Sequence, residues 1–219
     1  MKKMIAVTMS KGVKNDVEHE YLDKWYIDLF CGLGYLPVLI PNTDSGLKIL
    51  ESMKFAGIVL SGGADISFNY PSVVKAMLKE PSPVRDKVEE DVLNFALTNK
   101  IPIFGICRGI HFLNVKFGGD LLSGLSQISE ECYKDHYSAL HEIRFLKDNA
   151  AIQVNSYHHQ GFTERMISPE FEVLALSTKD GVVEAMAHKN LPILAVQWHP
   201  ERPNGNNKWV SDSIKDLFK

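Results

Sequence analysis

The segment from Ile101 to Gly109, IPIFGICRG, joins an apolar run to a cysteine that stands between two glycines. The run Ile101 to Ile106 predicts a buried strand. In the stretch Gly109 to Phe117, apolar residues recur three and four positions apart, as they do on one face of a helix. Cys107 is therefore expected at a sharp turn from strand to helix, where glycines leave room for the bend.

Short apolar runs alternate with helix-like stretches along the rest of the chain, which predicts an α/β fold with a largely parallel sheet covered by helices. The short connections near the C-terminus favour additional antiparallel strands. The polar segment from Leu121 to Asp148 predicts loops with at most one strand. Further predicted strands are Met4–Met9, Leu36–Ile40, Phe55–Leu60, Ile152–Val154, Phe171–Ser177, Val182–Met186 and Ile193–Gln197, and further helices are Tyr21–Leu33, Pro83–Asn99 and Trp209–Phe218.

Composition narrows the classes of function. The chain has 219 residues, a net charge of −3 and three cysteines without a CxxC pair. This charge favours neither nucleic acid nor an anionic membrane surface, and the sparse cysteines indicate a reducing, cytoplasmic setting. The apolar stretch in MKKMIAVTM is too short for a signal peptide, and no apolar run approaches the length that spans a bilayer. We expect one domain over residues 1–219, a small-molecule substrate and no cofactor.

The position of Cys107 indicates a nucleophile. A sulfur at a helix N-terminus faces free backbone amides and the positive end of the dipole, which favour the thiolate, and Arg108 adds positive potential. The thiolate is the attacking species in cysteine hydrolases. The alternative, a merely buried cysteine, is the interpretation for Cys31, which is expected on a helix face, and for Cys132.

A cysteine nucleophile needs a base, and the base needs a third group that fixes its orientation. The distal motif AVQWHPE, Ala195 to Glu201, supplies both. His199 follows an apolar run and is expected at a strand end, where Pro200 stiffens the bend and lets Glu201 turn back toward the imidazole. We predict His199 as the base and Glu201 as the residue that orients it.

Three motifs together, GICRG, AVQWHPE and the earlier SGGAD (61–65), resemble the class I glutamine amidotransferase superfamily. Within it, VNSYHHQ (154–160) and RDKVE (85–89) are similar to the peptidase C26 branch, the γ-glutamyl-γ-aminobutyrate hydrolase family. The resemblance implies a three-layer αβα, flavodoxin-like fold. It also implies that Cys107 attacks a γ-glutamyl carbonyl to form a thioester, that His199 protonates the departing amine, and that water then releases glutamate.

The resemblance also implies roles around the nucleophile. The backbone amides of Gly63 and Arg108 match the oxyanion hole of the family. The polar side chains of Asn155, Ser156 and His158 match contacts to the α-amino and α-carboxylate groups of the substrate. His111 stands where the family usually has a glutamine that helps to hold the glutamyl group, so we expect a substrate contact of altered chemistry there.

Several alternatives stay open at this point. The substrate is either γ-glutamyl-γ-aminobutyrate or, as in shorter relatives that act in capsule decoration, γ-glutamyl-CDP-amidate. A glutaminase subunit that supplies ammonia to a synthase partner is the alternative function, and a non-catalytic binding module is disfavoured because the cysteine, histidine and glutamate occur together. The sequence leaves a homodimer open.

The sequence does not assign every titratable residue. Arg85 and Asp86 either pair with each other, contact groups of the active site, or begin a solvated helix. The roles of His136 and His141 are undetermined. The adjacent His158 and His159 predict no metal site, because neighbours in a strand point to opposite faces.

Overall fold

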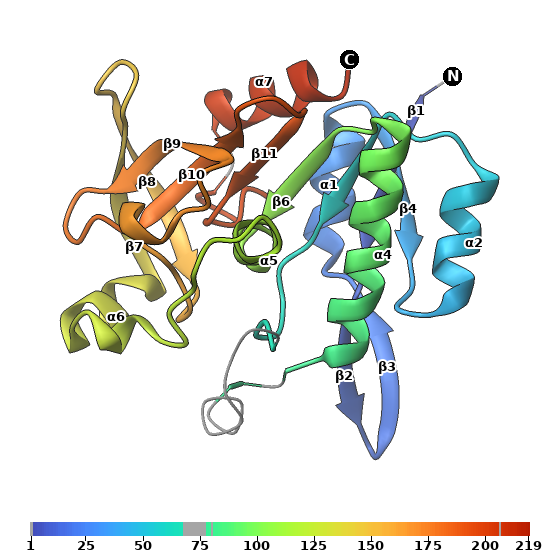
Figure 1. Ribbon diagram of the computed structural model, residues 1–219, viewed down its shortest axis with the longest axis horizontal. Coiled ribbons are helices and arrows are strands. Elements are labelled where there is room, and N and C mark those ends of the chain that lie inside the picture. The colour runs from blue at the N-terminus through green and yellow to red at the C-terminus, as the bar shows by residue number, and fades with distance from the viewer. Residues whose placement is uncertain (1, 68–77, 80, 206) are drawn as a thin grey trace.

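The computed structural model describes residues 2–67, 78–79, 81–205 and 207–219, and these form a nine-stranded sheet and a separate hairpin. Five neighbouring strands of the sheet are parallel and four extend it on one side (Figure 1). The parallel part consists, in spatial order, of β4 (Tyr35–Ile40), β1 (Lys3–Thr8), β5 (Gly57–Leu60), β6 (Ile103–Ile106) and β11 (Ile193–Val196).

The four remaining strands run antiparallel to their neighbours and continue the sheet beyond β11. They are, in spatial order, β10 (Val183–His188), β9 (Phe171–Ser177), β7 (Tyr137–Phe145) and β8 (Ala151–Tyr157). The pairing of β10 with β9 is irregular between Val183 and Met186. This extension places the VNSYHHQ motif at the end of an edge strand, far in sequence from the parallel strands.

Helices cover both faces of the sheet, because residues that alternate along each strand enter two separate hydrophobic cores. Helices α1 (Lys24–Gly32) and α7 (Lys208–Leu217) pack on the face that carries Ile5 and Val7. Helices α2 (Asp44–Ser52), α4 (Pro83–Asn99) and α5 (Arg108–Lys116) pack on the opposite face. The expected three-layer αβα fold is confirmed. None of the described helices is long and apolar enough to cross a membrane.

The predictions for α4 and β9 match the structure residue for residue. Ser82 caps α4 by accepting a hydrogen bond from the backbone of Arg85 at 3.4 Å, and Pro83 occupies the first turn, where a missing N–H costs nothing. The β6 and α5 predictions, which decide the fold, agree within two residues. The strand-to-helix turn at Cys107 is therefore where the sequence placed it.

Three elements differ from the prediction. The helix predicted from Tyr21 begins at Lys24, and a hairpin of β2 (Ser10–Lys14) and β3 (Val17–Tyr21) precedes it and projects beyond the sheet (Figure 1). Helix α2 was not predicted. The segment from Leu121 to Asp148, predicted as loops with at most one strand, contains the strand β7 and also α6 (Glu130–His136), a helix that was not predicted.

These differences have local physical causes. The hairpin is mostly exposed and lacks the apolar alternation of a core strand, but Asn15 and Asp16 adopt the positive φ that a tight hairpin turn requires. Helix α6 is only seven residues long. It is held by the Ser129 side chain, which accepts a hydrogen bond from the backbone of Cys132 at 3.0 Å.

Glycines allow the nucleophile turn to pack against neighbouring strands. A Cβ atom on Gly109 would lie 2.5 Å from the backbone oxygen of Leu60, and one on Gly105 would lie 3.0 Å from the Cβ atom of Ala195. Helix α5 therefore begins in contact with the backbone of β5. This contact is available only to glycine.

We predict that Gly109→Ala lowers the free energy of unfolding by about 1–3 kcal/mol, because the added methyl group overpacks a backbone contact. Gly32→Ala is the matched control, since Gly32 is helical and a Cβ atom there would meet nothing within 4 Å. That variant should be more stable than the wild type by roughly 0.5–1 kcal/mol. Urea unfolding measures both, and a Gly109→Ala protein as stable as the wild type would contradict the packing described.

Candidate active site

Cys107 occupies an unusual backbone conformation between β6 and α5. Its φ of 51° and ψ of −103° lie outside the main allowed regions for an L-residue, a geometry that costs on the order of 1–3 kcal/mol. The surrounding structure holds it in place, because the Cys107 amide donates to the oxygen of Val196 on β11 at 2.9 Å. The side chain is buried, with 5% of the residue exposed. The turn therefore has the strained geometry of a nucleophile elbow.

His199 lies beside this turn because β11 is the parallel neighbour of β6. A Cβ atom placed on Gly62 would be 2.8 Å from Cε1 of His199 and 3.5 Å from Cβ of Cys107, so the two side chains approach the same glycine. Nδ1 of His199 lies 2.6 Å from Oε1 of Glu201. The nucleophile, base and orienting carboxylate predicted from the sequence are thus brought together.

The electrostatics of His199 follow from these neighbours. Burial lowers the pKa of His199, but the negative charges of Cys107 and Glu201 outweigh it and raise the pKa to about 10. Burial also raises the pKa of the neighbouring Tyr26 well above its ordinary value, with Glu201 adding to the shift. The surroundings of His199 therefore favour its protonated, imidazolium form.

Asn155 fixes the backbone of the His199 turn rather than facing the pocket. Its Nδ2 donates to the oxygens of His199 at 2.9 Å and Pro203 at 3.0 Å, and its Oδ1 accepts from the His199 amide at 2.9 Å. Ser156, predicted like Asn155 as a substrate contact, is fully buried and donates to the oxygen of His136 at 2.9 Å. Both polar atoms of the Asn155 side chain are therefore hydrogen-bonded to the backbone of the chain itself.

The loop at the end of β5 is held by the guanidinium of Arg85. Its Nη2 donates to the oxygen of Ser61 at 2.7 Å and its Nη1 donates to the oxygen of Gly62 at 2.9 Å. Gly63 has a φ of 140°, and a Cβ atom there would lie 2.4 Å from Nη1 of Arg85. The amide of Gly62 donates to the hydroxyl of Tyr26 at 2.9 Å. The loop therefore has a fixed conformation beside Cys107 and His199.

A buried network of charges extends from Arg85 to the residue after the nucleophile. Nε of Arg85 lies 2.9 Å from Glu89, Glu89 also bonds to Arg108, and Arg108 bonds in turn to Asp86. Burial raises the pKa of Glu89, but the two guanidinium groups outweigh it and lower the pKa overall. Arg85 is 0% and Asp86 5% exposed, so the possibility of a solvated helix start is wrong. The two residues pair with Glu89 and Arg108 respectively.

A small pocket opens beside Cys107. Its lining includes Gly63, Asp65, Arg108, His111, His158 and Gln160. Nε2 of His111 lies 2.6 Å from Oε1 of Gln197, and burial lowers the pKa of His111 to about 4. Of the residues predicted to contact substrate, the pocket therefore gathers His111 and His158. A second pocket, lined by Tyr21, Tyr26, Gly62, His199 and Arg202, shares Gly63 with the first.

Two contributors to the site were not predicted from the sequence: Gln197 orients His111, and Tyr26 binds the Gly62 amide. Asn155 was predicted at the site, but as a substrate contact and not as the anchor of the His199 backbone. Gln197 stands inside the AVQWHPE motif, which is a signal that sequence reasoning had available. Tyr26 comes from α1, and its position depends on packing that no local pattern indicates.

Comparison with known proteins shows the family of the chain. The model of the peptidase C26 family matches residues 3–201. The glutamine amidotransferase-like protein YvdE of Lactococcus lactis is 36% identical over 200 residues, covering 83% of this chain and 80% of that protein. The γ-glutamyl-γ-aminobutyrate hydrolase PuuD of Escherichia coli is 33% identical over 226 residues, covering 90% of this chain and 85% of that protein.

Solved structures agree at the level of the fold. A GMP synthase subunit from Thermoplasma acidophilum superposes with a TM-score of 0.69 at 19% identity, covering 100% of this chain and 93% of that one. A glutamine amidotransferase from Thermotoga maritima gives a TM-score of 0.60 at 13% identity, covering 99% of this chain and 84% of that one. The chain therefore belongs to the peptidase C26 family and is a hydrolase of the glutamine amidotransferase type.

Proposed function

We propose that this protein cleaves the γ-glutamyl amide bond of a small conjugate and releases glutamate through a thioester on Cys107. The main support for this proposal is the strained turn at Cys107, which has a φ of 51° and lies beside the imidazole of His199. Nδ1 of that imidazole lies 2.6 Å from Oε1 of Glu201. Strain at such a turn projects the sulfur away from the sheet and toward the helix amides. The raised pKa of His199 supports a thiolate and imidazolium pair as the resting state.

In the first half of the reaction, the Cys107 thiolate attacks the γ-carbonyl carbon and forms a carbon–sulfur bond. The carbonyl oxygen becomes an oxyanion, which the backbone amides of Gly63 and Arg108 stabilise. The His199 imidazolium then gives its proton to the departing nitrogen, the carbon–nitrogen bond breaks, and the amine leaves. The product of this half is a γ-glutamyl thioester and a neutral His199.

In the second half, neutral His199 takes a proton from water, and the resulting hydroxide attacks the thioester carbonyl. Collapse of the second tetrahedral intermediate breaks the carbon–sulfur bond and releases glutamate. The thiolate and imidazolium pair is then restored. Glu201 keeps its contact with Nδ1 throughout, so that the other ring nitrogen faces the substrate.

The pocket beside Cys107 suits the amino-acid end of a γ-glutamyl group. Gln160 lines it, and the buried Nε2 of this side chain has no hydrogen-bond partner among the described residues, so it is a donor suited to the α-carboxylate. Asp65 is a carboxylate in the same lining and suits the α-ammonium. His111 is neutral at pH 7 and offers a polar contact without charge. Asn155 is assigned a positioning role instead of substrate contact.

The second pocket is the candidate site for the leaving amine because it adjoins the proton donor His199. The guanidinium of Arg202 lines this pocket, lies 3.1 Å from Asp23 and stacks over the ring of Tyr157 at 4.8 Å. An amine that carries a carboxylate or phosphate would meet a guanidinium there. The similarity to PuuD favours γ-glutamyl-γ-aminobutyrate, and γ-glutamyl-CDP-amidate is the other candidate.

A glutaminase subunit that supplies ammonia to a synthase partner is the alternative function. Such a subunit would use the same Cys107 nucleophile as the proposed hydrolase, but its substrate would be glutamine and its activity would require the synthase partner. The fold alone does not separate the two functions, because a GMP synthase subunit has the same fold as this chain.

Glutamate release by the purified protein separates these functions. With glutamine, γ-glutamyl-γ-aminobutyrate, γ-glutamyl-butylamine and γ-glutamyl-CDP-amidate as substrates, we predict that one anionic conjugate reacts far faster than glutamine. Cys107→Ala should lower kcat by about 10⁴-fold or more, because it removes the nucleophile. The matched control is Cys31→Ala, since Cys31 is a free cysteine on α1 away from the pocket.

Activity of Cys31→Ala should equal that of the wild type. If glutamine alone reacts, and slowly, the ammonia-supplying function replaces the proposal. Full activity in Cys107→Ala would exclude the thioester.

The protonation of His111 predicts a specific acid sensitivity. Its folded pKa of about 4 lies below the unfolded value of about 6.5, so the unfolded chain binds the extra proton first as the pH falls. The stability that this difference contributes to the folded chain is fully present above pH 6.5 and is lost as the pH falls toward 4. The loss in the free energy of unfolding amounts to up to about 3 kcal/mol. His111→Gln should reduce the loss of unfolding free energy between pH 7 and pH 4.5, as measured by urea titration.

The exposed His19→Gln is the control for this measurement and should follow the wild type at both pH values. An unchanged pH dependence in His111→Gln would show that His111 is not held neutral by burial.

A further inference from the structure

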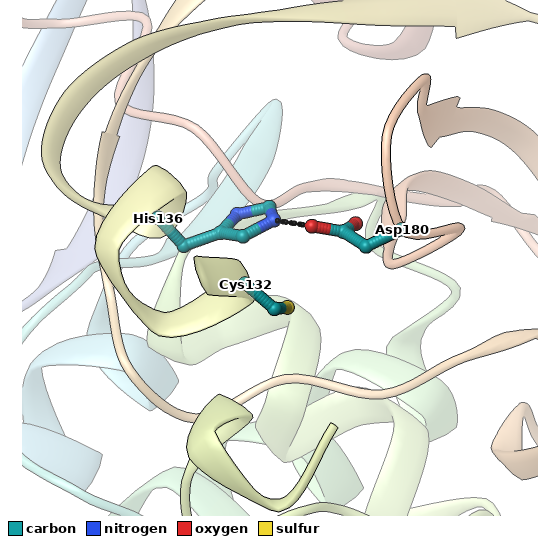
Figure 2. A group of neighbouring side chains, drawn as sticks. All are labelled: Cys132, His136 and Asp180. Atoms are coloured by element: carbon teal, nitrogen blue, oxygen red, sulfur yellow. Dashed lines mark hydrogen bonds and ion pairs between the residues drawn. The ribbon is translucent and has the colours of Figure 1, made fainter. Parts of the chain in front are cut away.

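A buried group of imidazoles and carboxylates lies behind the wall of the pocket, and the proposed hydrolysis does not use it. His136 ends α6, His158 follows β8, and Glu184 lies on β10. His136 and Glu184 are 0% exposed and His158 is 4% exposed. Their donor atoms all lie within 4.8 Å of one another. Asp180 also approaches this group, and Figure 2 shows its carboxylate hydrogen-bonded to His136 next to Cys132.

The hydrogen bonds of the two imidazoles assign their tautomers. Nδ1 of His158 lies 2.8 Å from the backbone oxygen of Gln160, which only accepts, so Nδ1 of His158 carries a proton. Nε2 of His136 lies 3.0 Å from Oδ2 of Asp180, so Nε2 of His136 carries a proton. In the neutral rings the remaining nitrogens, Nδ1 of His136 and Nε2 of His158, then bear lone pairs, and they face each other at 3.0 Å. Two lone pairs at this distance need a cation between them.

The carboxylate of Glu184 points to the same requirement. It is fully buried, its Oε2 has no hydrogen-bond partner in the described part of the chain, and its Oε1 is paired with the imidazole of His141. Oε1 lies 3.5 Å from Nδ1 of His136 and 3.1 Å from Nε2 of His141. A buried carboxylate is costly unless a positive charge compensates it.

We propose that His136 Nδ1, His158 Nε2 and Glu184 Oε1 bind a divalent transition-metal ion, most simply Zn²⁺. Two imidazole nitrogens and one carboxylate oxygen are a ligand set that zinc accepts. Ligands at about 2.0–2.1 Å from a tetrahedral zinc are roughly 3.3 Å apart, which agrees with the spacings of 3.0 and 3.5 Å here. His141, beside the same carboxylate, offers a further nitrogen.

The groups around the proposed ligands make the hydrogen bonds that usually surround metal-bound histidines. Metal-bound histidines usually donate their second ring N–H to a carboxylate or a backbone oxygen, which fixes the ring orientation. His136 does so to Asp180, and His158 does so to the oxygen of Gln160. Asp180 is therefore a positioning residue for the ion rather than a ligand.

The adjacent histidines explain why the sequence predicted no metal. Both histidines follow the end of β8, and Nε2 of His159 does not join the group but lies 3.0 Å from Oδ2 of Asp65. The partner of His158 is instead His136, 22 residues earlier, to whose backbone oxygen the amide of His158 donates at 3.0 Å. Only the antiparallel pairing of β7 with β8 brings the two rings together.

The ion would link three segments, the end of α6, the residues after β8, and β10, next to the candidate active site. His158 lines the pocket, and its ring centroid is 6.2 Å from that of His111. An ion at this site is expected to hold the segment after β8 in place, with no part in the bond-breaking steps. Metal binding at this site can therefore be tested without knowing the substrate of the enzyme.

The test uses the full chain, purified without chelators and then stripped of metal. We expect about one zinc per chain by elemental analysis before stripping. Titration of the stripped protein with Co²⁺ should give the visible absorption of a tetrahedral nitrogen and oxygen site, with saturation at one equivalent. Zn²⁺ should displace the cobalt and raise the melting temperature, because an ion that binds only the folded chain stabilises it.

His136→Gln and Glu184→Gln should abolish the cobalt absorption, and Asp180→Asn should weaken binding by about 10- to 100-fold. The exposed His19→Gln is the matched control and should bind cobalt like the wild type. The cobalt titration of the wild-type protein tests metal binding without any variant, so the test remains valid even if a variant fails to fold. A wild-type protein that contains no metal and gives no saturable cobalt absorption would overturn the proposal and assign the cation between the rings as a proton.

Discussion

The buried network of Arg85, Glu89, Arg108 and Asp86 is the constraint on which the candidate active site depends. It contains two positive and two negative side chains in a region without solvent, so each charge requires its partner. Arg85 holds the backbone oxygens of the loop after β5, and Arg108 begins the helix that follows Cys107. The network thereby fixes the two amides of the proposed oxyanion hole relative to each other.

The same constraint explains how the strained turn persists. Cys107 has an unfavourable backbone conformation, and such strain survives only where the surrounding structure compensates for it. Here the compensation comes from the pairing of β6 with β11, the contact of Gly109 with β5, and the ion pairs of Arg108. Because β11 also leads to His199, the contacts that hold the turn also set the position of the imidazole.

Local patterns in the sequence predicted the parts of this arrangement that depend on local chemistry. The apolar run before Cys107, the glycines around it and the HPE turn each determine their own conformation, so their positions agreed with the structure. The roles of Arg85 and Asn155 were not predictable, because each side chain acts on a segment more than twenty residues away. The pairing of His136 with His158 depends on strand register, which the polar segment between residues 121 and 148 does not reveal.

In the proposed mechanism, one γ-glutamyl thioester on Cys107 lies on the path from every substrate to glutamate. Its most direct test is turnover in the presence of hydroxylamine, which competes with water for the thioester and gives a γ-glutamyl hydroxamate. Two γ-glutamyl amides with different leaving amines should give the same ratio of hydroxamate to glutamate at one hydroxylamine concentration, because both pass through the same intermediate. A ratio that changes with the leaving amine would contradict the account.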